Sequence, residues 1–149
     1  MRKSIIAILM TFCLSIMTYA QTPRDRATEL KEQAQSSLNQ KDYIKARYLF
    51  KKAYEAFATR ENYPQAIECG VQANALYVRE NFYKEGFELC RDMDQLIWAG
   101  EQNQKKVFYD LRFLVNKERL QMYTALKNPA QAKTQLNKLE ETANLAKND

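Results

Sequence analysis

The chain has 149 residues, which is enough for one domain with a hydrophobic core. It contains no histidine, which excludes histidine-based acid–base catalysis, Ser-His-Asp triads and histidine metal sites. Glycine and proline number only three each, so long helices are favoured over a β-fold with many tight turns, and we expect an all-α protein. We also expect that the protein is not an enzyme and that it binds no metal or cofactor.

The amino terminus has the layout of a secretory signal peptide. Arg2 and Lys3 precede an apolar run of 13 residues at 5–17, and Ala20 ends the segment at a position where a signal peptidase cleaves. An uncleaved anchor is the alternative, although the run is shorter than the roughly 20 residues of a comfortable transmembrane helix. Residues 1–20 are therefore predicted to be a signal peptide, and the mature chain is predicted to be periplasmic or in the cell envelope.

The mature chain would carry 21 basic and 18 acidic residues, and this net charge of +3 is too small to indicate nucleic-acid binding. After a polar lead-in at 21–26, a helical domain is predicted over 27–146, followed by a polar tail at 147–149. Pro64, two residues after Asn62, and Pro129, directly after Asn128, each suit the first turn of a helix. Gly100 is predicted to end a helix. The expected helices are 27–39, 43–59, 64–80, 82–99, 103–127 and 129–146.

An internal repeat organises these helices. Tyr43, Ala46, Phe50 and Ala53 form a stripe along one helix, and an equivalent stripe recurs 40 and then 46 residues later. Self-similarity at such a period indicates stacked helical hairpins, each too small to bury its apolar face alone. We therefore predict a short α-solenoid of three antiparallel hairpins. The recurring stripes are Tyr83, Gly86, Cys90 and Met93, then Pro129, Ala132, Leu136 and Leu139.

At these positions the chain resembles the tetratricopeptide repeat (TPR) family. Ala34 fills the small position of the first helix, and Tyr77 and Tyr123 fill its aromatic position in the later repeats. The repeats are longer than the usual ~34 residues, and Asn74 departs from the pattern. An export signal followed by such repeats is also similar to the sensor region of Gram-negative (Bacteroidetes-type) histidine kinases and helix-turn-helix regulators. The chain would then be either a stand-alone exported protein or the front part of a longer sensor.

The TPR resemblance implies a concave groove lined by the first helix of each hairpin, which would hold an extended peptide or a partner's helix. Three of the nine groove residues are basic and none is acidic, so they could hold a carboxylate; the alternative is that they are ordinary solvated residues. The groove positions are Lys31, Gln35, Asn39, Val71, Ala75, Arg79, Lys117, Gln121 and Thr124.

Three further residues have two interpretations each. Cys69 and Cys90 could form a disulfide in an oxidising compartment, or they are buried free thiols. Trp98 is either a core residue or an exposed interface anchor, and we expect the core.

The function we expect is a binding module for a protein or peptide, with a role as the sensor part of a signalling protein as a variant. One alternative is a structural subunit that self-associates through its end helices, where Leu136 and Leu139 would contribute. The other is a histidine-free hydrolase with a carboxylate or cysteine site. The sequence does not identify the partner.

Overall fold

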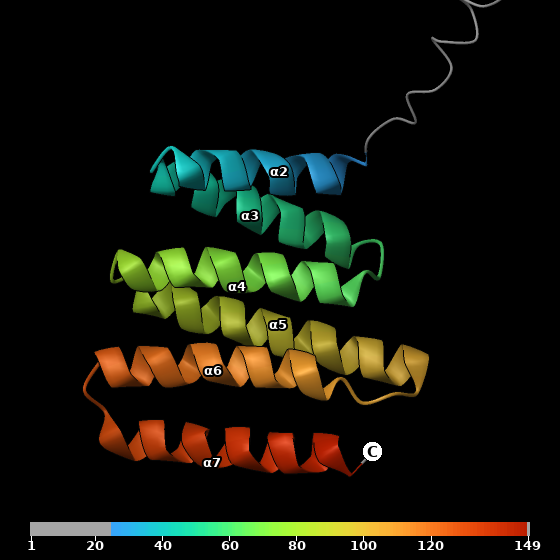
Figure 1. Cartoon of the computed structure of the whole chain (residues 1–149), viewed down its shortest axis with the longest axis vertical. Coiled ribbons are helices and arrows are strands. Elements are labelled where there is room, and N and C mark those ends of the chain that lie inside the picture. Colours follow the sequence, from blue (N-terminus) through green and yellow to red (C-terminus); the bar gives the residue numbers. More distant parts are fainter. Residues whose placement is uncertain (1–24, 149) are drawn as a thin grey trace, which may run out of the picture.

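The computed structural model describes residues 25–148, so the predicted signal peptide lies outside the described part. All regular secondary structure in that part is helical, which confirms the prediction of an all-α fold (Figure 1). The predicted boundaries agree within one or two residues for four of the six helices. The helices are α2 (Arg26–Asn39), α3 (Tyr43–Ala58), α4 (Tyr63–Arg79), α5 (Tyr83–Gln104), α6 (Tyr109–Ala125) and α7 (Pro129–Lys147).

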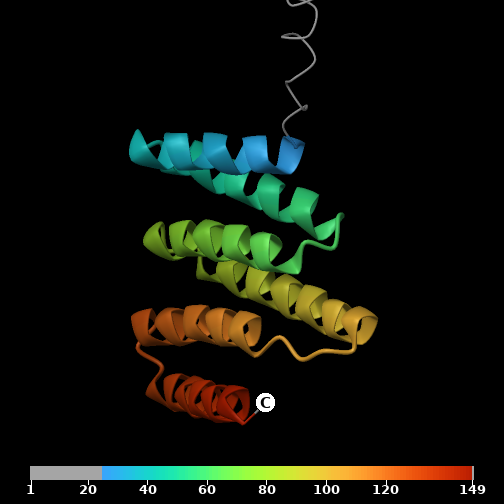
Figure 2. The same cartoon turned by 45° about the vertical axis from the view of Figure 1, so that its right-hand side comes forward.

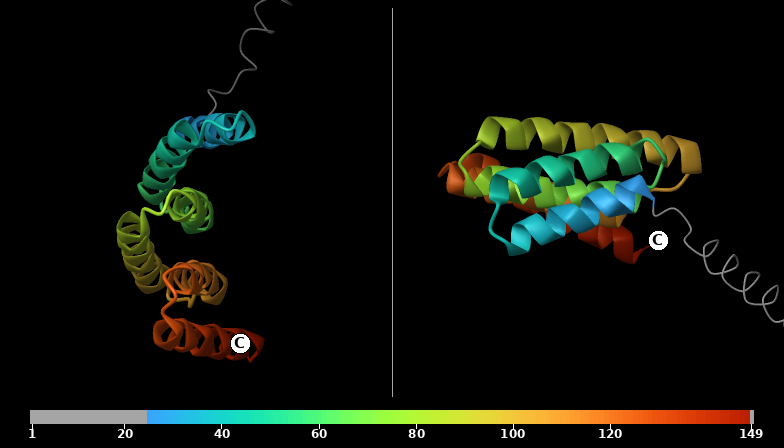
Figure 3. Two further views of the ribbon diagram at one scale, coloured as in Figure 1. Left: turned by 90° about the vertical axis from the view of Figure 1, so that its left-hand side faces the viewer. Right: turned by 90° about the horizontal axis from the view of Figure 1, so that it is seen from above.

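Each helix packs against the next one along the chain, and α4 also contacts α6 (Figures 1 and 2). Viewed nearly along the helices, α2, α4 and α6 lie on one side of the stack and α3 and α5 lie on the other (Figure 3, left). The stack bends, so that α2 and α7 at its ends project towards the side of α4 and α6. This arrangement is compatible with a helical repeat of three hairpins, α2–α3, α4–α5 and α6–α7.

Four of the five connections between these helices have the same backbone structure. Each contains one residue with positive φ: Lys41, Glu61, Asn81 or Lys127. The amide after it donates to a carbonyl five residues earlier, as from Asp42 to Ser37 at 2.9 Å. This is the Schellman pattern, which satisfies the free carbonyls at a helix end. Because the turn is so short, it holds consecutive helices antiparallel.

The connection from α5 to α6 is different, and it corrects two predictions. Gly100 does not end a helix, because α5 continues to Gln104 and ends at Lys105, which has a φ of 51°. The next helix begins at Tyr109 rather than at residue 103. Gly100 is required for close packing instead, since a Cβ atom there would lie 2.8 Å from the ring of Phe108.

The core follows the predicted stripes in the first two hairpins. Ala46, Phe50 and Ala53 are fully or almost fully buried, and Ile67 and Met93 of the second hairpin belong to the same core cluster. In the last helix, α7, the buried residues are Leu139 and Gln135. Leu136 of the same predicted stripe is exposed. The carboxyl-terminal helix thus contributes one apolar residue, Leu139, to the buried core.

Candidate functional site

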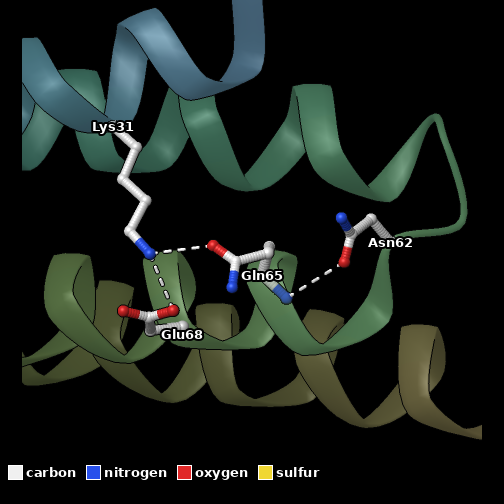
Figure 4. A network of polar contacts seen from close by, with 4 residues as sticks. All are labelled: Lys31, Asn62, Gln65 and Glu68. Carbon is white, nitrogen blue, oxygen red and sulfur yellow. Dashed lines mark hydrogen bonds and ion pairs between the residues drawn. The ribbon is translucent and has the colours of Figure 1, made fainter. Parts of the chain in front are cut away.

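The nine predicted groove residues lie on α2, α4 and α6, the helices that share one side of the stack (Figure 3). Lys31 is already engaged within the protein: its Nζ donates to Glu68 Oε2 at 2.7 Å and to Gln65 Oε1 at 2.8 Å (Figure 4). The main-chain amide of Gln65 in turn donates to Asn62, the residue that caps α4. This network joins the first hairpin to the second and uses the charge of Lys31 within the stack.

A second predicted groove cation also has a partner inside the molecule. The Arg79 guanidinium lies 3.9 Å from the ring centroid of Tyr43 on α3, a cation–π contact. Val71 is half-buried against the core, and Lys117 is exposed. Two of the three predicted cations therefore stabilise the stack, which weakens the case for a carboxylate clamp. The other five predicted residues are exposed: Gln35, Asn39, Ala75, Gln121 and Thr124.

A cleft of about 460 Å³ lies between α5, α6 and α7. Its most exposed large apolar residues are Trp98 on α5 and Leu145 on α7, with 62% and 48% of their surface accessible. The expectation that Trp98 belongs to the core is therefore wrong. The lining residues are Asp94, Ile97, Trp98, Tyr109, Arg112, Asn116, Arg119, Lys138, Glu141, Thr142 and Leu145.

Two ion pairs fix the wall between α5 and α6. Arg119 pairs with Asp94 and donates to the carbonyl oxygen of Cys90 at 3.0 Å. Arg112 Nε donates to the buried carboxylate of Glu101 at 2.7 Å, and the same carboxylate accepts from the amide of Phe108 at 2.8 Å. These bonds, led by the one from Arg112, lower the pKa of Glu101 below its ordinary value. Residues of the cleft wall are thus held in place before any partner arrives.

The sequence analysis missed this cleft, although one signal was present. The buried residues of α5 lie at 86, 89, 90, 93, 97, 100 and 101, and so recur on one face of the helix at the helical period. Trp98 lies outside that series, so the helical period itself predicts an exposed side chain. A large aromatic residue outside the buried stripe was the available indication of a binding surface.

A polar pair is buried between the second and third hairpins. Asn74 on α4 donates from Nδ2 to Glu118 Oε2 on α6 at 2.9 Å, and both residues are almost fully inaccessible. Burial raises the pKa of Glu118, while the bond from Asn74 and the nearby Lys117 lower it by less. Asn74, which departs from the TPR pattern, is thus the partner of a buried acid.

Both described cysteines are buried and unpaired, so the possible disulfide between Cys69 and Cys90 is not formed in this structure. Burial raises the pKa of Cys69 to about 11 and that of Cys90 to about 12. Because the thiolate is the nucleophile, neither side chain is suited to catalysis near neutral pH. The described residues also contain no cluster of three or more acidic or cysteine side chains that could hold a metal ion.

No helix within residues 25–148 is both long and apolar enough to cross a membrane. In comparisons with known proteins, no family model matches the chain, and no curated protein or solved structure matches it. The resemblance to helical repeat proteins is therefore supported by the motif spacing and by the packing of consecutive helices.

Proposed function

We propose that this protein is an exported, TPR-like binding module that holds a protein or peptide partner, either alone or as the sensor part of a signalling protein. The observation that carries this proposal is the cleft between α5, α6 and α7, with Trp98 exposed at its edge. Its volume lies in the range of known ligand sites, roughly 300–1,000 Å³.

The chemistry of the cleft suits a peptide segment. Trp98, Tyr109 and Leu145 offer an apolar surface, and Lys138 and Glu141 are exposed at the cleft for polar contacts. Tryptophan and tyrosine are enriched among the residues that dominate binding energy at interfaces, because they bury a large area at a low cost in conformational entropy. A partner with one or two apolar side chains, flanked by polar residues, would fit.

The experiment uses Trp98 as a probe, because it is the only tryptophan of the chain. Peptides selected from a random displayed library against the whole protein should shift the Trp98 emission to shorter wavelengths when they bind. In an anisotropy assay with labelled peptide, the Trp98→Ala/Leu145→Ser variant should bind at least about tenfold more weakly.

The matched control is Lys117→Glu/Gln121→Glu, which alters the predicted groove on α6 without removing a hydrogen bond or an ion pair described above. It should leave peptide binding unchanged. Binding that is lost in this control but retained in the Trp98→Ala/Leu145→Ser variant would assign the function to the predicted groove instead. Failure to select any binding peptide would refute the peptide-binding proposal.

A further inference from the structure

The exposed side of α3 differs from the exposed side of α5, the equivalent helix of the next hairpin. Ile44 and Tyr48 lie one helical turn apart on α3 and are 69% and 61% accessible. The equivalent positions on α5, 40 residues later, are Lys84 and Glu88, which are also exposed. The hairpin therefore folds with polar residues at both positions, and packing does not account for the two apolar residues of α3.

Ile44 and Tyr48 belong to a larger apolar patch. Together with Tyr77 on α4 they line a hollow of about 390 Å³, and Arg47 is among the lining residues. The Arg47 guanidinium lies 4.8 Å from the ring centroid of Tyr77 and 5.0 Å from that of Phe82. Phe82 is 44% accessible. Large exposed apolar side chains that gather around a hollow indicate an interaction surface.

Phe82 lies at a position where other helices have a capping residue. Asp25, Asp42 and Asn62 each accept a main-chain amide with a side-chain oxygen at the start of α2, α3 and α4. Phe82 precedes α5 and makes no such bond, because its side chain has no oxygen. An exposed aromatic ring in place of a stabilising cap departs from the local rule, and such departures occur at binding sites.

The hollow also carries an excess of positive charge. Its lining contains three cations, Arg47, Lys51 and Lys52, and one acid, Glu55. Arg47 pairs with Glu80, and Lys52 pairs with Glu55 on the surface. An exposed pair contributes little stability, so Lys52 can exchange its partner at small cost. Lys51 forms no ion pair within residues 25–148.

This charge belongs to α3 and does not recur on α5. Residues 44–52 contain four cations and no acid, whereas the equivalent residues 84–92 contain two cations and three acids. A second copy of the chain would thus present either another basic helix or one of mixed charge, and like charges in contact are unfavourable. The best complement to the hollow is an acidic group that also carries an apolar side chain.

We propose that this hollow binds an acidic segment of a partner protein, in which a large apolar side chain is flanked by carboxylates. The apolar side chain would pack against Ile44 and Tyr48, and the carboxylates would pair with Lys51 and Lys52. A concave site takes single side chains, whereas a bilayer surface is flat. The hollow shares no lining residue with the cleft between α5, α6 and α7, so this proposal does not depend on the function of that cleft.

The test begins with the whole protein carrying Trp98→Ala/Leu145→Ser, which removes the apolar anchors of the cleft. Peptides selected against it from a random displayed library should be acidic and contain a large apolar residue. Their affinity, measured by the anisotropy of labelled peptide, should fall at least about tenfold when Ile44→Lys/Tyr48→Glu is added. That variant gives α3 the residues that α5 has at the same positions, so it should remain folded.

The charges are tested by a second pair of variants. Lys51→Glu/Lys52→Glu should also weaken binding at least about tenfold, and added salt should weaken binding to the unmodified hollow, because exposed charges are screened. The matched control, Lys84→Glu/Arg91→Glu, makes the same change of charge on α5 and should leave binding unchanged. Circular dichroism checks that each variant is folded, and the lysine variant decides the question if Ile44→Lys/Tyr48→Glu is not.

Three results would overturn the proposal. The first is that no peptide is selected, or that the selected peptides are neutral or basic. The second is binding that persists in both α3 variants or is lost equally in the α5 control, which would place the contact elsewhere. The third is binding to vesicles of phosphatidylglycerol and phosphatidylcholine that is lost in Ile44→Lys/Tyr48→Glu while no peptide binds, which would assign this surface to a membrane.

Discussion

The buried pair between Asn74 and Glu118 allows a quantitative prediction. Asn74 uses its Nδ2 for Glu118, but its Oδ1 has no hydrogen-bond partner within residues 25–148. The substitution Glu118→Gln keeps an acceptor for Nδ2, removes a buried charge and adds an NH₂ group that can donate to Oδ1. One additional hydrogen bond contributes about 1 kcal/mol. We therefore expect the variant to be more stable by about 1 kcal/mol at pH 7, which raises Tm by about 4 °C.

The raised pKa of Glu118 determines how its contribution to stability changes with pH. Because burial raises the pKa of Glu118 in the folded chain, the folded state holds the proton more tightly than the unfolded state. The contribution of Glu118 to stability is therefore greatest below its unfolded pKa and is lost as the pH rises through the folded pKa. The advantage of Glu118→Gln should grow over the same interval and shrink at lower pH.

Urea unfolding followed by circular dichroism between pH 4.5 and 8 measures this difference. Glu118→Ala is the control: it leaves Nδ2 of Asn74 unsatisfied and should cost about 2 kcal/mol. A Glu118→Gln variant that is less stable than wild type at pH 7, or whose advantage does not depend on pH, would refute the reasoning.

Gly100→Ala should destabilise the protein by about 1–3 kcal/mol in thermal unfolding, because two aromatic rings lie within about 3 Å of the new Cβ atom; an unchanged Tm would contradict this. Glu101→Gln should cost about 2 kcal/mol, since it weakens charge-assisted bonds that hold the start of α6. Because the pKa of Glu101 is lowered in the folded state, its contribution to stability is present above its unfolded pKa and is lost as the pH falls through its folded pKa. A Glu101→Gln variant whose loss of stability does not depend on pH would contradict this. Cys69 and Cys90 should not react with a thiol reagent at pH 8 until denaturant is added, and rapid labelling of the native protein would show that they are accessible. Trp98→Ala should change stability by less than about 0.5 kcal/mol, and a larger loss would mean that Trp98 is part of the core.

Most of the fold was determined locally, and the sequence therefore predicted it. Helical periodicity and the capping residues Asp42, Asn62 and Asn128 depend on neighbours within one or two turns. The expected helix ranges placed four of the five connections within about two residues of their observed positions. The order and number of helices, and the pairing of consecutive helices, could be predicted for the same reason.

The start of α6 could not be predicted, because it depends on contacts across the stack. Glycine is a common helix terminator, but Gly100 lies within α5, where two aromatic rings from other segments pack so closely that a side chain would not fit. The carboxylate of Glu101, on the preceding helix, accepts a hydrogen bond from the main-chain amide of Phe108. It therefore takes the place of a capping side chain next to the start of α6. A residue in one element that satisfies the backbone of another leaves no short-range signal.

The candidate site divides in the same way. The sequence showed a resemblance to TPR proteins, and that resemblance implied that Lys31, Arg79 and Lys117 belong to one groove. Only the tertiary structure decided which of these charges are available, because the carboxylate and the ring that engage Lys31 and Arg79 come from other helices. The cleft beside Trp98 likewise arises from the positions of three helices, and such positions are fixed by packing between segments rather than by the period of any one of them.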